Sequence, residues 1–166
     1  MVSVAPTTLK AEPLPLPDTL KLQELGYSPR WQALFEPYIA AGLILARVIR
    51  IDRGSALIVT PTGVVRAKLA ARLLKAAGGP ADLPAVGDWV AALAPDHLDV
   101  PLIEAVLERA STITRGDPGR PSNIQVLAAN IDTVFVVHPV AQSPNLRRIE
   151  RELSMAWDSG AAPVVV

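Results

Sequence analysis

The sequence predicts a small β-barrel followed by the beginning of a parallel α/β domain, and three observations support this. Short apolar segments separated by turn residues occupy residues 43 to about 110, which is the pattern of an all-β barrel. A Gly- and Pro-rich stretch interrupts that pattern at residues 111–122. A continuously apolar strand, an amphipathic helix and a second apolar strand then follow, which is typical of a parallel βαβ unit.

The composition is that of a folded chain without thiol chemistry. Half of the 166 residues are apolar and only 4% are aromatic, so we expect a core of Val, Leu, Ile and Ala. The absence of cysteine excludes disulfides and thiolate metal sites and fits a reducing compartment. His97 and His138 lack the spacing of zinc ligands. The longest charge-free apolar stretch, residues 37–46, is shorter than the ~20 residues of a membrane-spanning helix. No secretion signal is visible either, so we predict a cytoplasmic protein without membrane contact.

The N-terminal part is predicted to be a tail and one short helix. Residues 1–27 start with a proline-rich stretch and are expected to be disordered or extended. In residues 28–42, Ser28 is a predicted N-cap and Pro29 the first helical residue. Four large apolar side chains at i, i+3, i+4 and i+7 share one face: Trp31, Leu34, Phe35 and Tyr38. We expect this face to pack on the barrel; a peptide-binding groove is the alternative.

Residues 43–112 are predicted to form the barrel. Five apolar segments of strand length alternate with turn residues, at 43–51, 56–60, 64–67, 86–93 and 101–109. Between the third and fourth strands, residues 68–77 change to helical spacing and end at Gly78 and Gly79. Five strands with a helix in this position is the order of an OB-fold. An SH3-like barrel, which lacks that helix, is the nearest competitor.

Residues 113–122 are predicted to be a linker, and residues 123–166 to begin an α/β domain. The expected strand, helix and second strand lie at residues 131–138, 145–159 and 161–166. Ser143 is the predicted N-cap of the helix, and Gly160 stands where a helix-ending glycine belongs. Two parallel strands and one helix cannot bury their own apolar faces. We therefore expect this unit to be an incomplete part of a larger domain.

Charge is segregated along the barrel, although the whole chain has zero formal net charge. From residue 43 to 76 there is one acid, Asp52, and there are seven bases, a balance of +6: Arg47, Arg50, Arg53, Arg66, Lys68, Arg72 and Lys75. From residue 80 to 108 there are six acids and no Lys or Arg, a balance of −6: Asp82, Asp88, Asp96, Asp99, Glu104 and Glu108. Pairing between the two sets is one interpretation, but exposed ion pairs contribute only about 0–1 kcal/mol each and do not explain the segregation.

The basic half of the barrel is predicted to bind RNA; a charged face that is simply solvated is the alternative. OB-folds bind oligonucleotides across their second and third strands and the adjoining loops. Lys68 and Arg72 are like charges at i and i+4 of the predicted helix, and nearby phosphates would offset their repulsion. The candidate RNA-binding residues are the seven bases named above together with Arg115 and Arg120 of the linker. Trp89 is predicted to be core, so we expect backbone and shape recognition of structured RNA rather than base stacking, and no binding of DNA.

Nucleotide and catalytic motifs are missing from the sequence. There is no G-x-x-x-x-G-K-[ST], no G-x-G-x-x-G and no N-K-x-D. The Gly-Asp-Pro-Gly segment at residues 116–119 is predicted to be a linker turn, with an anion-binding loop as the alternative. We therefore assign no catalytic, nucleotide-binding or metal-binding residue, and we expect the chain to be inactive alone.

Four segments resemble a known family in their order and spacing. They are LARVIRIDRG at residues 45–54, LPAVGDWV at 83–90, QVLAANIDTVFVV at 125–137 and NLRRIERELSMAWDSGAAPVVV at 145–166. Together they resemble the RsgA family, the circularly permuted GTPases of small ribosomal subunit biogenesis. The resemblance covers roughly residues 20–166 and corresponds to the N-terminal portion of such proteins.

The resemblance implies an OB domain, a permuted P-loop-type GTPase domain and a C-terminal zinc-binding domain. It implies that the barrel binds small-subunit rRNA and that the full-length protein hydrolyses GTP to control its release. GTP, Mg and a structural zinc would be the cofactors of that protein. The family's N-K-x-D motif would follow directly after Val166, so no cofactor is expected in this chain.

Two other function classes remain as alternatives. One is a non-enzymatic OB-fold RNA-binding adaptor that folds with a partner. The other is a dinucleotide-binding protein, which would need a glycine fingerprint after the first strand of the βαβ unit. Residues 138–145 contain no glycine.

Overall fold

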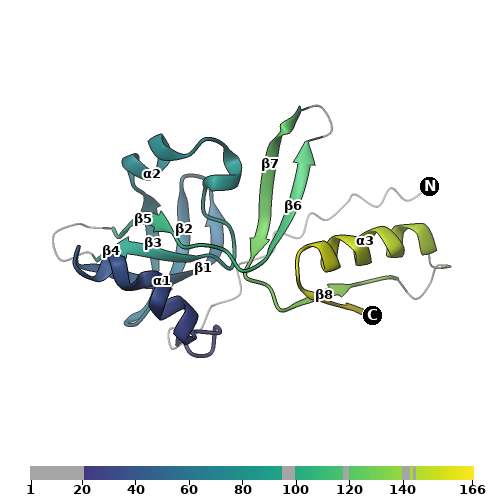
Figure 1. The fold of residues 1–166 in the computed structure, drawn as a ribbon, viewed down its shortest axis with the longest axis horizontal. Coiled ribbons are helices and arrows are strands. Elements are labelled where there is room, and N and C mark those ends of the chain that lie inside the picture. Colours follow the sequence, from purple (N-terminus) through teal and green to yellow (C-terminus); the bar gives the residue numbers. More distant parts are fainter. Residues whose placement is uncertain (1–20, 95–99, 118–119, 140–142, 144) are drawn as a thin grey trace, which may run out of the picture.

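The computed structural model describes residues 21–94, 100–117, 120–139, 143 and 145–166. His97, Asp96, Asp99 and most of the predicted tail lie outside these residues. The described part forms a closed five-stranded barrel, a two-stranded hairpin and a two-stranded parallel pair. The barrel lies at one end, the parallel pair with its helix at the other, and the hairpin projects between them (Figure 1). Within the described ranges, no helix is long and apolar enough to cross a membrane.

The barrel has the strand order of an OB-fold. Its strands are β1 (Leu43–Asp52), β2 (Ser55–Thr60), β3 (Gly63–Leu69), β4 (Trp89–Leu93) and β5 (Leu102–Val106). They close in the order β1-β2-β3-β5-β4, and every pair is antiparallel except β3 with β5. α2 (Ala71–Ala76) lies between β3 and β4 in the chain. The predicted OB-fold is therefore confirmed, and the helix argues against the SH3-like alternative.

Small and β-branched side chains fill the barrel interior. Alternate residues of each strand point inward, because successive side chains of a strand point to opposite faces. The buried cluster consists of Ala46, Val48, Ala56, Ile58, Ala67, Val90, Ala92 and Ile103. Alanine supplies half of these positions, so the interior of the barrel is narrow and filled by side chains.

A second apolar cluster lies outside the barrel wall, under α1 (Pro29–Ile39). The ring of Trp31 stacks on that of Trp89 with 5.5 Å between the centroids, and the ring of Tyr27 lies 6.0 Å from Trp89. Trp89 is fully buried, as predicted. The apolar face of α1 thus packs on the barrel. The predicted disordered or extended tail is wrong for residues 21–27, because Tyr27 and two leucines before it join this cluster.

α2 is shorter than the helix predicted over residues 68–77. Lys68 and Leu69 belong to β3 and pair with β5. This parallel pairing closes the barrel, so tertiary contacts override the helical spacing of the segment. The predicted i, i+4 repulsion between Lys68 and Arg72 is wrong, because Lys68 is not helical.

The predicted linker over residues 113–122 is also wrong, because it holds much of a β-hairpin. β6 (Thr112–Asp117) pairs antiparallel with β7 (Arg120–Ala129). Thr and Ile alternate at the start of β6, and residues 124–129 are mostly apolar, so both segments suit a strand. Gly116 lies near the end of β6 and Pro121 near the start of β7. The Gly- and Pro-rich composition was therefore misleading for these two strand ends.

The last elements form the predicted parallel βαβ unit: β8 (Thr133–Val136), α3 (Leu146–Asp158) and β9 (Ala162–Val165). Asn145, not Ser143, is the N-cap of α3, and its Oδ1 accepts a hydrogen bond from the Arg148 N–H at 3.2 Å. Gly160 has a φ of 84° directly after the helix. The N–H groups of Gly160 and of the next residue donate to carbonyls of the last helical turn, so the predicted helix end is confirmed.

Candidate nucleic-acid interface

A β-bulge in β1 turns Arg50 to the outside of the barrel. Val48 pairs with Ile58, and both side chains are buried in the interior. Simple alternation would also point Arg50 inward, because it lies two residues after Val48. The register shifts between these two residues, and Arg50 pairs with Leu57 instead. The extra residue thus places a guanidinium on the outer face.

Four cations and one carboxylate make up the surface that we call the basic face: Arg50, Arg53, Arg66, Lys68 and Asp52. Arg50 and Arg66 are both strand partners of Leu57, and Asp52 and Lys68 are both partners of Ser55. Paired residues of adjacent strands point to the same side, so these side chains stand in two neighbouring rows. Arg53 is exposed in the turn after β1. Four positive charges less one leave a formal charge of +3.

Asp52 orders the two arginines of the basic face. Arg50 Nε and Nη2 donate to the two carboxylate oxygens of Asp52, each at 2.9 Å, and Arg66 Nη1 donates to Oδ2 at 2.6 Å. Arg66 Nη1 also lies 3.0 Å from Ser55 Oγ. The hydrogen bonds from Arg50, and then from Arg66, lower the pKa of Asp52 below its ordinary value. Asp52 is therefore ionised at neutral pH and holds both guanidiniums in fixed positions.

Arg53 and Lys68 differ from these arginines. Both are exposed, and neither makes an ion pair within the described residues. A charge that is not already compensated gains more from a phosphate than one that is. They are therefore the cations of the basic face that are most available to a polyanion.

The helix α2 carries the next two predicted residues. Arg72 pairs with Glu104 of β5, which is the only pair between the two predicted charge sets in the described part of the chain. Lys75 is exposed in the last turn of α2. Among the described residues, the alternative of mutual pairing between the basic and acidic segments thus applies to Arg72 alone.

The remaining predicted residues are not part of the basic face as defined above. Arg47 is half-buried, with its guanidinium 5.3 Å from the centre of the Trp89 ring, and its Nη2 donates to the Asn130 carbonyl at 3.0 Å. Burial lowers the pKa of Arg47. Arg115 is exposed on β6, and Arg120 begins β7. Arg47 therefore contacts the junction with the rest of the chain and not the outer surface of β1–β3.

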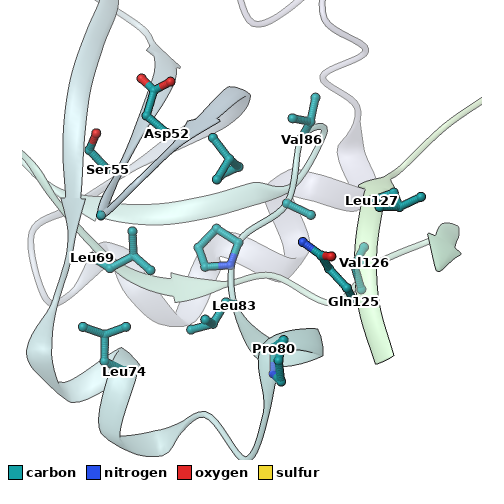
Figure 2. A pocket seen from close by; sticks show the side chains of 14 residues that line it. Asp52, Ser55, Leu69, Leu74, Pro80, Leu83, Val86, Gln125, Val126 and Leu127 are labelled. Atoms are coloured by element: carbon teal, nitrogen blue, oxygen red, sulfur yellow. The ribbon is translucent and has the colours of Figure 1, made fainter. Parts of the chain in front are cut away.

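A groove of about 430 Å³ borders the basic face. Its walls come from the end of β1, from α2, from the 3-10 turn η1 (Pro80–Asp82) and from β7 (Figure 2). Figure 2 shows Asp52 and Ser55 on one side and Gln125, which extends from β7, on the other. Most of the remaining lining is apolar, including Leu74 and Leu83. The groove could not be predicted from the sequence, because residues of β7 form one of its walls and the hairpin β6–β7 was not predicted.

Asn130 connects the barrel to the βαβ unit. It has a φ of 54°, and its side chain accepts a hydrogen bond from the Ala110 N–H at 2.8 Å and donates to the Gly87 carbonyl at 3.0 Å. Its own N–H donates to the Ser111 carbonyl, and its carbonyl accepts from Arg47. Gly87 lies so close to the backbone of Ala129 that an added Cβ would lie 2.1 Å from the Ala129 carbonyl oxygen. Two segments of the sequence meet at this junction, GDWV at residues 87–90 and AAN at residues 128–130. They are the sequence signals from which the junction could have been predicted.

Asp88 of the same GDWV segment holds a buried ion pair. It is fully buried and accepts bonds from Arg109 Nε at 2.8 Å, from Arg109 Nη2 at 2.7 Å and from the Ala85 N–H at 2.7 Å. Arg109 also donates to the carbonyls of Ala81 and Leu83. Asp88 is thus an internal structural residue, although the charge count placed it in the acidic segment.

The chain is 40% identical over 141 residues to the small ribosomal subunit biogenesis GTPase RsgA of Streptomyces avermitilis, which covers 85% of this chain and 37% of that protein. It is 39% identical over 155 residues to RsgA of Opitutus terrae, covering 89% of this chain and 42% of that protein. No family model matches the chain.

The predicted resemblance to the RsgA family is confirmed. Two solved structures share the fold with a TM-score of 0.53 each: YloQ, a circularly permuted GTPase, at 17% identity, and YjeQ from Thermotoga maritima, at 21%. Each match covers 74% of this chain. It covers 39% of the YloQ chain and 40% of the YjeQ chain. The chain thus spans about two fifths of the length of the RsgA proteins that it matches.

Proposed function

We propose that this chain supplies the RNA-binding barrel and the first part of the GTPase domain of a small ribosomal subunit biogenesis GTPase. The barrel binds small-subunit rRNA in the cytoplasm, and GTP hydrolysis controls release of the protein. The names of the RsgA relatives and the confirmed OB-fold support this function. The observation that carries the RNA-binding part is the basic face, with a formal charge of +3 on one side of β1–β3.

The basic face suits the RNA backbone. Arg50 and Arg66 are held in fixed positions by Asp52, and Arg53 and Lys68 are available for phosphates. We propose Lys75 and Arg72 of α2 as neighbouring contacts, and Arg115 and Arg120 as contacts of the hairpin. Phosphate contacts position a protein on nucleic acid without reading the sequence. Structured rRNA, recognised by its shape and backbone, is therefore the proposed partner.

The βαβ unit fits the beginning of a nucleotide-binding domain. Several of its large apolar side chains are exposed, among them Phe135 at 65% and Trp157 at 62%. We propose that further GTPase elements of the full-length protein cover them. Within the described ranges no three metal-ligating side chains cluster together. By resemblance to the RsgA proteins, GTP with Mg, and a structural zinc, are proposed for the full-length protein.

The experiment is co-sedimentation of the chain with purified small and large ribosomal subunits. We expect binding to small subunits and a weakened complex when Arg53 and Lys68 are both changed to Ala. The matched control changes Arg147 and Arg151 of α3, which are also exposed, to Ala and should bind like the unmodified chain. Equal binding to both subunits, or an unchanged complex with the Arg53/Lys68 variant, would contradict the proposal.

A further inference from the structure

The groove beside the basic face has the composition of a binding site for a flat, partly apolar group. Exposed apolar side chains from three separate elements converge on it: Ile51 of β1 is 42% exposed, Leu74 of α2 51% and Leu127 of β7 44%. Single exposed apolar residues are ordinary, but a contiguous patch marks an interaction surface. Pro80 and Pro84 also line the groove and present rigid apolar rings.

Polar groups lie on two sides of the groove, Asp52 at its border with the basic face and Gln125 across from it. Asp52 accepts three hydrogen bonds from Arg50 and Arg66, and a carboxylate has about four acceptor positions. Among the described residues, one position is therefore left for a donor from a ligand. Gln125, on the opposite side in Figure 2, offers both a donor and an acceptor.

We propose that this groove takes one unpaired nucleobase of the RNA whose backbone lies on the basic face. This inference rests on the proposed function, and it names the kind of RNA that the site recognises. A base that is turned out of a helix is held between apolar side chains and read along its hydrogen-bonding edge. The groove, at about 430 Å³, offers both features next to cations that reach the attached phosphates.

Charge favours a nucleotide over an apolar peptide as the occupant. The groove opens beside Arg53 and Lys68, whose charges are not compensated within the described residues. A nucleotide brings an apolar ring and an anionic phosphate together, which matches this arrangement. The ionised Asp52 accepts hydrogen bonds only, so it favours a base with an exocyclic amino group, which carries two N–H donors, over uracil, whose edge carries the single N3–H.

The experiment measures binding of the full chain to three RNA hairpins, with one bulged adenine, one bulged uracil or no bulge. The adenine is replaced by fluorescent 2-aminopurine in a parallel sample to report on its surroundings. We expect about tenfold tighter binding of the adenine bulge than of the fully paired hairpin. The double variant Leu74→Ser/Leu127→Ser should lose this preference and keep the salt dependence of binding. Val137→Ser, at an apolar position that is 69% exposed outside the groove, is the matched control.

Each outcome decides between the claims. Equal affinity for bulged and paired hairpins would overturn the groove proposal, leave an apolar peptide as its occupant and keep the proposed function. If the double variant still bound the adenine bulge more tightly than the paired hairpin, the base would lie elsewhere, and the groove proposal would also be overturned. No binding to any hairpin or to small subunits would overturn the proposed function itself. Leu74→Ser alone, in the short exposed helix α2, provides a second variant should the double variant fail to fold.

Discussion

At the scale of single residues, the basic face depends on Asp52. Its carboxylate binds two arginines, so it lowers the net charge of the face and at the same time fixes two of its cations. A folded-state pKa below the ordinary value of 3.8 means that the ionised form stabilises the fold. That stability is present above pH 3.8 and is lost as the pH falls through the lowered pKa.

Asp52→Ala should therefore destabilise the chain at pH 7 and have little effect at strongly acidic pH. The reason is that protonation removes the same ion pairs that the substitution removes. Urea unfolding of the unmodified chain and the variant at both pH values measures this. A difference in unfolding free energy that does not shrink on acidification would show that the carboxylate acts in another way.

Asn130 should contribute more to the stability of the chain than an exposed helix cap does. Asn130→Ala leaves the Ala110 N–H and the Gly87 carbonyl without their partner and keeps a non-glycine residue at a φ of 54°. We expect a loss of about 2–4 kcal/mol in unfolding free energy. Asn145→Ala, which removes only the exposed N-cap of α3, should cost about 1 kcal/mol. Equal losses from the two variants would argue against a central role for Asn130.

At the scale of elements, the junction is built by the close approach of the GDWV segment to the end of β7. Gly87→Ala would place its Cβ against the Ala129 backbone and should cost about 3 kcal/mol or more. Gly54→Ala is the control, because Gly54 also has a positive φ of 76° but has open space around it, and about 1 kcal/mol is expected. Thermal or urea unfolding of both variants measures the loss of stability. The difference between the two losses separates the effect of the close backbone contact at Gly87 from that of the positive φ, which both glycines share. Similar losses would contradict the proposed close packing.

Most elements could be predicted from local pattern, and the failures share one cause. The five barrel strands and the βαβ order follow from apolar periodicity and turn residues. The hairpin β6–β7 and the strand character of Lys68 depend on pairing with distant segments, which local spacing does not report. The groove depends on that hairpin, and the half-buried position of Arg47 depends on Asn130, 83 residues later. The sequence thus predicted that this segment is basic. It did not predict which cations Asp52 holds in place, which are available for phosphates and which are buried.

At the scale of the whole molecule, the exposed apolar surface of the βαβ unit should cause self-association. Leu146 is 66% exposed and Trp157 62% on α3, and the sheet of β8 and β9 has only two strands in the described structure. Sedimentation velocity should show the weight-average mass rising with concentration. The double variant Leu146→Lys/Trp157→Lys should stay closer to the monomer. An unmodified chain that remains monomeric at every concentration would contradict this expectation.

We propose that phosphates of RNA lie on the basic face of the barrel. The most direct test is the slope of log K against log salt concentration for binding to small-subunit rRNA. Each phosphate contact contributes roughly 0.7–0.9 to the steepness of this slope. Arg53→Ala/Lys68→Ala should therefore reduce the steepness by about 1.4–1.8, whereas Arg147→Ala/Arg151→Ala should leave it unchanged. The same slope for the unmodified chain and the Arg53/Lys68 variant would show that RNA binds elsewhere.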